Sequence, residues 1–201
     1  MGGSAYTYAA SLSYTPEECI VEVGSERGEG STAYLAFLAS ECGVPFFSID
    51  VDPDAAERAR SIGGVQVLLG YAEDHLANWD GPPVRFAWID GHDWPYSWCA
   101  RETWFKDQQA RYAARGDTVT EEASMASHLV IARLIDPLTR SGTVVMFDDT
   151  WRDRNRRRGE GRWRGKGGTA VPYLIKTGAW RLTGCVNGTE PDDGFARLEK
   201  M

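Results

Sequence analysis

The sequence lacks the features that mark membrane, secreted and zinc-binding proteins. It contains no apolar run of about 18 residues, the length that a membrane-spanning helix requires, so we expect no membrane partner. Its N-terminus has no basic segment followed by an apolar stretch, so a secretory signal is not expected. The four cysteines are scattered without Cys-x-x-Cys spacing, which disfavours zinc and favours free thiols in a reducing cytoplasm.

Positive charge is scarce outside one segment. The net charge is −7, which argues against a general nucleic-acid-binding surface. Residues 152–166, however, contain eight Arg or Lys and two acidic residues, a local charge of +6. We interpret 151–168 as a basic, lid-like loop that recognises an anionic or sugar-like ligand, or else as a solvated surface loop. RNA is the less favoured partner, because no aromatic platform accompanies the loop.

The order of the apolar runs predicts the fold. The 201 residues show no internal repeat and no linker, which predicts a single domain over 1–201. Short runs rich in β-branched and aromatic residues predict strands at Cys19–Val23, Phe46–Ile49, Val65–Leu69, Arg85–Ile89, Thr143–Phe147, Trp180–Cys185 and Phe195–Leu198. Helical patterns lie between them at Ser31–Cys42, Pro53–Ile62, Thr118–Leu138 and Val171–Thr177. This alternation predicts an α/β fold, a mostly parallel seven-stranded sheet with helices on both faces and a late antiparallel hairpin.

Local signals refine this outline. Asp52 before Pro53 predicts a capped helix start, and Thr118 with Glu121 has the spacing of a capping box. Residues 94–120 fit no strand and are rich in aromatic side chains. We interpret 94–120 as an insertion on the substrate side, over the carboxyl ends of the strands, where ligands bind in such folds.

A glycine-rich turn follows the first predicted strand. Its glycines at positions 24, 28 and 30 do not have the spacing of a dinucleotide fingerprint, and the Lys of a P-loop is absent. Glu22, in an otherwise apolar strand, disfavours a pyrophosphate and favours a ligand that carries an ammonium group. The alternative is that Glu22 caps a nearby loop. The ligand contacts predicted here are Glu22, Gly24, Ser25, Gly28 and Ser31.

The ends of the next two strands extend this predicted site. Asp50 ends the second strand, where an acidic side chain can accept bonds from both hydroxyls of a ribose. The loop Gly70–Leu76 follows the third strand and can wrap an adenine ring. Asp74 and His75 in this loop are equally well explained as helix caps. The ligand contacts predicted here are Asp50, Ala72 and Glu73.

Three carboxylates follow the fourth and fifth strands. Asp90 ends one, and Asp148 with Asp149 ends the other, at neighbouring positions on the same edge of a parallel sheet. Uncompensated, they would repel one another, and at least one would take up a proton. A hard cation relieves this repulsion, so we predict a metal site at these aspartates for Mg²⁺, with Mn²⁺ or Ca²⁺ behind it. The alternative is that Asp148 or Asp149 caps the next segment or binds arginines of the basic loop.

The order and spacing of these motifs resemble class I S-adenosylmethionine-dependent methyltransferases, and within them the macrocin O-methyltransferase and cephalosporin-hydroxylase-like group. The resemblance covers about 19–166 and rests on the glycine turn, the loop 70–76, the Ile-Asp-Gly turn at 89–91 and the Asp-Asp pair at 148–149. It implies a Rossmann-like methyltransferase fold with S-adenosylmethionine as the cofactor. It also implies that Glu22 meets the cofactor's ammonium group, that Asp90 contacts the cofactor, and that the three aspartates hold the metal.

The resemblance further implies metal-assisted O-methylation of a small natural-product-like acceptor, a sugar or a phenol. The metal would lower the pKa of the acceptor hydroxyl, and His92 or Asp93 would take its proton. His92 comes first because an unperturbed imidazole pKa of roughly 6.5 suits the task, although it could instead bond a loop carbonyl. The alternatives are a metal-independent N-methyltransferase or cofactor-cyclising enzyme, and a non-catalytic cofactor-binding module. A homo-oligomer is left open.

Overall fold

A computed structural model describes residues 3–25, 30–96, 102–152, 162–186 and 194–201 of the chain. Within them, seven strands form one sheet in the order β3-β2-β1-β4-β5-β9-β8. They are β1 (Cys19–Val23), β2 (Phe46–Asp50), β3 (Val65–Leu69), β4 (Val84–Ile89), β5 (Thr139–Phe147), β8 (Trp180–Val186) and β9 (Phe195–Lys200). The first five are parallel, and β9 runs antiparallel to β5 and β8. The predicted mostly parallel sheet with a late antiparallel hairpin is confirmed.

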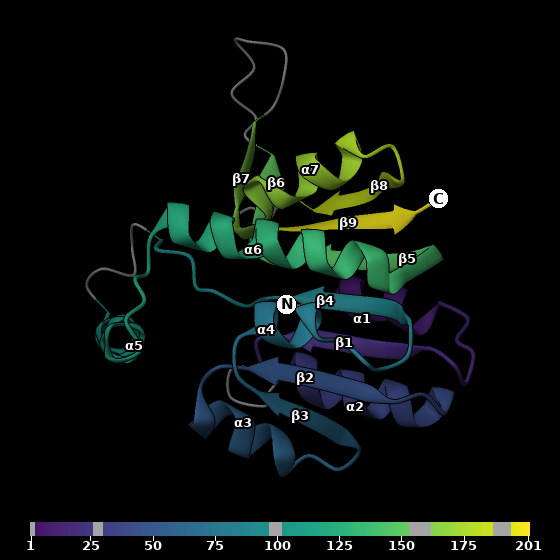
Figure 1. Cartoon of the computed structure of the whole chain (residues 1–201), viewed down its shortest axis with the longest axis horizontal. Helices are drawn as coiled ribbons and strands as arrows, with labels where there is room; N and C mark the ends of the chain where they lie inside the picture. The colour runs from purple at the N-terminus through teal and green to yellow at the C-terminus, as the bar shows by residue number, and fades with distance from the viewer. Residues whose placement is uncertain (1–2, 26–29, 97–101, 153–161, 187–193) are drawn as a thin grey trace.

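Helices cover both faces of the sheet, as predicted. On the face nearer the viewer in Figure 1 lie α4 (Ala72–Ala77), α6 (Glu121–Ile135) and α7 (Ala170–Lys176). On the far face lie α1 (Gly3–Ala10) and α2 (Ser31–Cys42), and α3 (Pro53–Arg60) packs against β2 and β3. Among the described residues, no helix has the length and apolar character needed to cross a membrane.

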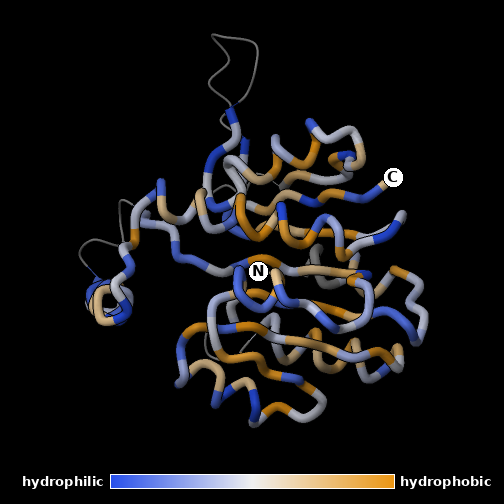
Figure 2. The backbone as a smooth tube through the Cα atoms, in the orientation of Figure 1, coloured by the Kyte–Doolittle hydropathy of each residue, from blue (hydrophilic) through white to orange (hydrophobic). Residues whose placement is uncertain are grey.

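Alternation along β1 divides the core between the two faces. Val21 and Val23 belong to the apolar cluster under α6 and α7, whereas Ile20 belongs to the cluster under α1 and α2. All five residues of β1 are buried, which is typical of a central parallel strand covered on both faces. Figure 2 shows the hydrophobic residues concentrated along the strands. Glu22 shares the α2 side of the strand with Ile20, so a carboxyl group enters an apolar layer there.

One predicted helix start is wrong. Thr120, not Thr118, precedes α6, and its hydroxyl accepts a hydrogen bond from the amide of Ala123 at 3.0 Å. The two threonines stand two positions apart in a polar segment, so spacing alone did not distinguish them. The predicted cap of α3 is confirmed, because the Asp52 carboxylate accepts a bond from the Asp54 amide at 2.9 Å.

The two segments set apart in the sequence contain regular structure. The insertion 94–120 includes α5 (Thr103–Ala114), which lies beyond the carboxyl ends of the strands in Figure 1; its residues 97–101 are outside the described ranges. The described ends of the basic segment pair as a two-stranded antiparallel ladder, β6 (Thr150–Arg152) with β7 (Trp163–Gly165). Residues 153–161, at the centre of the predicted lid, are outside the described ranges.

Candidate active site

A cavity of about 550 Å³ lies at the carboxyl ends of β1, β2 and β4. Its wall includes many of the residues that the sequence singled out: Gly24, Asp50, Ala72, Glu73, Asp90, His92, Asp93 and Asp149. This is the edge where ligands bind in open α/β sheets, and the volume lies within the range of small-molecule sites. Predicted contacts that follow five separate strands, β1 to β5, are thus brought together in one place.

The glycine turn begins at Gly24, a position that only glycine can occupy. Gly24 has a φ of 88°, and a Cβ on it would lie 2.2 Å from the carbonyl oxygen of Asp90. Its amide donates to the carbonyl of Ile49 at 2.8 Å, so the turn is packed between the ends of β2 and β4. Of the other predicted contacts, Ser31 begins α2, and Gly28 lies outside the described residues.

Glu22 lies beneath this turn and is not part of the cavity wall. Its side chain is fully buried, and Oε2 accepts hydrogen bonds from Ser48 Oγ at 2.6 Å and Thr32 Oγ1 at 2.8 Å. Its other oxygen, Oε1, is buried and finds no partner among the described residues. Burial raises the pKa of Glu22 to about 7. Its contact with an ammonium group therefore stays a prediction.

Asp50 connects the end of β2 with the glycine turn. Oδ2 accepts bonds from the amide of Ser25 at 2.8 Å and from its hydroxyl at 2.9 Å, while Oδ1 accepts from the Asp52 amide at 2.8 Å. These bonds fix the direction of the carboxylate on the cavity wall. A carboxylate offers about four lone-pair sites, so Asp50 keeps capacity to accept from a ligand. Burial raises its pKa.

The start of α4 forms the wall where an adenine ring was predicted. Ala72 and Glu73 are the first two residues of this helix and both line the cavity. The Glu73 carboxylate accepts a bond from Ser127 Oγ of α6 at 2.6 Å. The sequence identified this segment as a loop, because a helix of six residues leaves little periodic signal.

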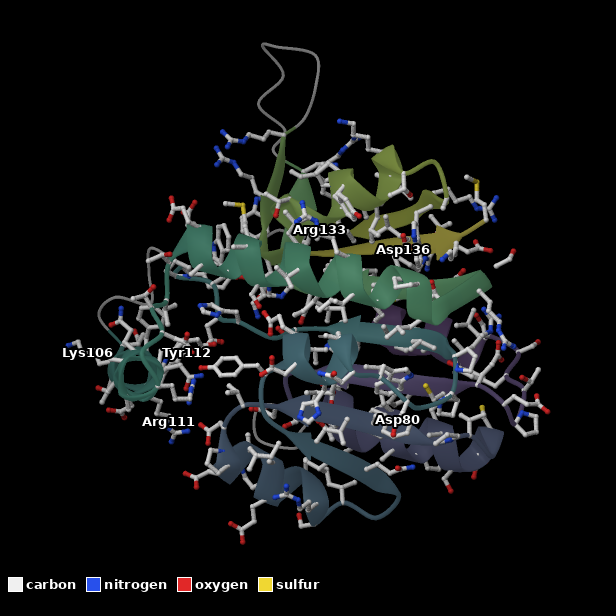
Figure 3. The ribbon with its side chains drawn as sticks, viewed as in Figure 1. Asp80, Lys106, Arg111, Tyr112, Arg133 and Asp136 are labelled. Carbon is white, nitrogen blue, oxygen red and sulfur yellow. The ribbon has the colours of Figure 1, made fainter. Side chains whose placement is uncertain are left out.

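Helix α5 forms the opposite side of the cavity. Figure 3 shows Tyr112 extending from α5 toward the sheet, whereas Lys106 points away from it. The Asp93 amide donates to the Tyr112 hydroxyl oxygen at 2.9 Å, and Gln108 Nε2 donates to Asp93 Oδ2 at 2.7 Å. Arg111 forms an ion pair with Asp52 at 2.9 Å. These contacts attach α5 to the ends of β2 and β4; no sequence pattern identified them.

One ring nitrogen of His92 contacts the backbone of the segment that precedes α6. Its Nε2 lies 2.9 Å from the carbonyl oxygen of Thr118. A carbonyl can only accept, so Nε2 carries a proton in this bond. The ring also packs edge to face on Tyr112, with centroids 4.7 Å apart. The structure therefore contains the loop-carbonyl alternative, and this bond does not use Nδ1.

Aromatic residues join the insertion to the base of the basic segment. Trp151 of β6 packs edge to face on Trp94 at 6.0 Å and lies within 19° of parallel to Tyr96 at 6.3 Å. Trp94 and Tyr96 line the cavity, as do Trp104 and Phe105 of α5. This side of the cavity therefore offers flat apolar surfaces of the kind on which a ring can stack.

The three aspartates converge as predicted, but an ammonium group is their counter-charge. Lys166 Nζ contacts Asp90 Oδ1 and lies 3.0 Å from Asp149 Oδ2, and the lysine is 4% exposed. Burial opposes the charge of Lys166, but Asp149 and Asp90 outweigh it and raise the lysine pKa. Burial and the neighbouring Asp149 raise the pKa of Asp148 to about 7.

The residues present do not fit the predicted magnesium ion. In the described part of the chain, no group of three His, Cys, Asp or Glu side chains is arranged to hold a metal. Lys166 lies between Asp90 and Asp149, whose oxygens a divalent ion would need. This role of Lys166 was not predicted, because the lysine lies at the end of the basic segment. The available signal was a single lysine flanked by glycines, Gly-Lys-Gly-Gly at 165–168.

Comparison with known proteins gives matches at the level of structure. No protein-family model matches the chain. No curated protein matches it either. Among solved structures, an O-methyltransferase from Bacillus cereus in complex with S-adenosylhomocysteine has a TM-score of 0.56 and 17% identity, over 100% of this chain and 82% of that one.

Two further structures differ from it in the acceptor they name. A candidate rRNA methylase from Clostridium thermocellum has a TM-score of 0.63 and 12% identity, over 99% of this chain and 96% of that one. The N-methyltransferase NodS from Bradyrhizobium japonicum WM9, in complex with S-adenosylhomocysteine, has a TM-score of 0.52 and 16% identity, over 98% and 86%. At these identities the likeness shows the fold alone, and the Rossmann-like methyltransferase fold expected from the sequence is confirmed.

Proposed function

We propose that this protein is an S-adenosylmethionine-dependent methyltransferase that methylates a hydroxyl group on a small, ring-containing acceptor. The observation that carries the proposal is the composition of one cavity wall, in which Gly24, Asp50 and the start of α4 meet at the carboxyl edge of the sheet. Two structures with the same fold, the Bacillus cereus enzyme and NodS, were determined with S-adenosylhomocysteine, the demethylated cofactor.

In this proposal each strand end binds a different part of the cofactor. Asp50 accepts a hydrogen bond from one ribose hydroxyl at its remaining lone-pair site. Ala72 and Glu73 border the adenine ring. The positively charged amino-acid end lies at the glycine turn, with its ammonium group directed toward the buried Glu22. The negative side chains suit this ligand, because both its ammonium and its sulfonium groups are cationic. The same carboxylates would repel a pyrophosphate, which disfavours a dinucleotide.

The acceptor lies between the sulfonium and the aromatic residues of the insertion. Its oxygen attacks the methyl carbon in line, the carbon–sulfur bond breaks, and neutral S-adenosylhomocysteine leaves. The hydroxyl proton passes to Nδ1 of His92, with Asp93 as the second choice of base. Most of the acceleration comes from positioning the two reactants in the cavity. No step requires a metal ion.

A transfer assay tests this function. The protein is incubated with methyl-labelled S-adenosylmethionine and, separately, with simple phenols, simple sugars, amines and a short RNA. We expect label in a phenol or a sugar, and a large loss of transfer in His92→Ala. Label only in amines would contradict O-methylation, and label only in RNA would contradict a small-molecule acceptor. Cofactor binding without transfer to any of these probes would favour the non-catalytic binding module.

A further inference from the structure

The position of Lys166 is fixed by the backbone around it. Gly165 has a φ of 78°, and a Cβ there would lie 1.8 Å from the carbonyl oxygen of Asp149. The Lys166 amide donates to that same carbonyl at 3.0 Å, and the Gly167 amide donates to Thr150 Oγ1 at 2.8 Å. The backbone of Lys166, which directly follows β7, is therefore held against the segment that follows β5.

The side chain of Lys166 ends among carboxylates. Its ammonium group contacts Asp90 and Asp149, and the lysine belongs to the cavity wall while only 4% exposed. A divalent ion would bind the same oxygens at about 2.0–2.6 Å, and its charge would then lie against the ammonium group. The two cations exclude one another, because a buried like-charge pair is strongly unfavourable.

We propose that Lys166 is a built-in counter-ion that takes the place of a divalent metal between Asp90 and Asp149. It neutralises the carboxylates that would otherwise repel one another, and it excludes Mg²⁺ from the cavity. An ammonium group has three donors; Lys166 donates to Asp90 and forms an ion pair with Asp149, so at least one donor remains for an oxygen of the acceptor. Lys166 thus positions the acceptor oxygen, a role that a metal ion would otherwise have. This last step rests on the proposed function, whereas the exclusion of metal does not.

Manganese binding, followed by electron paramagnetic resonance, tests the exclusion directly. We compare wild type, Lys166→Ala and the control Lys176→Ala, which removes an exposed lysine from α7. Wild type and the control should show no Mn²⁺ binding that depends on Asp149. Lys166→Ala should bind Mn²⁺ at least about tenfold more tightly, a difference of about 1.4 kcal/mol, and should lose this gain when Asp149→Asn is added.

Two results would overturn the proposal. One is wild-type Mn²⁺ binding that Asp149→Asn abolishes, because the site would then accept a metal despite the lysine. The other is a folded Lys166→Ala protein, as judged by circular dichroism, that binds Mn²⁺ no better than wild type. If Lys166→Ala does not fold, Lys166→Gln replaces it, because Gln keeps most of the length and a polar end without the charge. The wild-type result still decides.

The functional part is tested by EDTA. Methyl transfer by wild type should be unchanged when EDTA is added and again when Mg²⁺ is restored. Transfer that is lost with EDTA and recovered with Mg²⁺ would contradict a built-in counter-ion. Absence of transfer to every probe acceptor would contradict the proposed function, and the manganese measurement would still decide whether Lys166 excludes metal.

Discussion

Replacing Glu22 by Gln should remove a pH dependence from the free energy of unfolding. Glu22 is fully buried, and one of its carboxylate oxygens has no partner among the described residues. Burial raises its pKa from 4.5 to about 7 in the folded protein. The folded state therefore holds the Glu22 proton more tightly than the unfolded state does. This contribution to stability is complete below about pH 4.5 and is lost as the pH rises through about 7.

The size of the effect follows from that change in pKa. Each pKa unit is worth about 1.36 kcal/mol, so a rise from 4.5 to about 7 corresponds to about 3 kcal/mol. Gln carries no charge at any of these pH values and can bond the same hydroxyls. Other buried acids, such as Asp148, titrate in both proteins, so their effects cancel in the difference between the variant and wild type.

Urea unfolding at several pH values measures this difference. Wild type should lose stability as the pH rises from about 4.5 to about 8. The free energy of unfolding of Glu22→Gln, relative to that of wild type, should therefore increase by about 3 kcal/mol over this range. Glu57→Gln, an exposed change on α3, should run parallel to wild type as the control. Parallel profiles for Glu22→Gln and wild type would show that burial does not raise the pKa of Glu22, because its carboxyl would then titrate as an exposed one does.

Three further substitutions test other parts of the site. Asp50→Ala should weaken S-adenosylmethionine binding by about tenfold or more, because it removes the acceptor of a ribose hydroxyl. Equal affinity by calorimetry, with Glu57→Ala as the control, would contradict that role. His92→Ala should lower kcat by about a hundredfold while cofactor affinity stays unchanged, and full activity would exclude His92 as the base. Gly165→Ala should cost at least about 1 kcal/mol, because its Cβ would lie 1.8 Å from the Asp149 carbonyl oxygen; an unchanged Tm would show that the backbone can move there.

The sequence predicted the sheet well because each central strand is a short apolar run with turn residues at its ends. The predicted ranges of β1 and β3 match the observed ones. The beginning of β5 was missed, since Thr139–Gly142 is polar and pairs only where Thr139 meets Val84 on β4. Local pattern therefore located buried strands and failed where pairing alone extends a strand.

The carboxylates of the site were also predictable, since each one directly follows a strand. The partner of these carboxylates was not, because Lys166 is 76 residues from Asp90 and reaches it only through the β6–β7 ladder. The sequence of a basic segment does not show whether its last residue is exposed to solvent or buried. The counter-charge was therefore predicted as a metal ion, and the structure contains an ammonium group in its place.

Calorimetric titration of the purified protein with S-adenosylmethionine, before and after EDTA, shows whether the cavity binds this cofactor. We expect binding at micromolar concentrations that EDTA does not change and that Asp50→Ala weakens. If neither S-adenosylmethionine nor S-adenosylhomocysteine binds, the proposed function is wrong and the cavity takes another ligand.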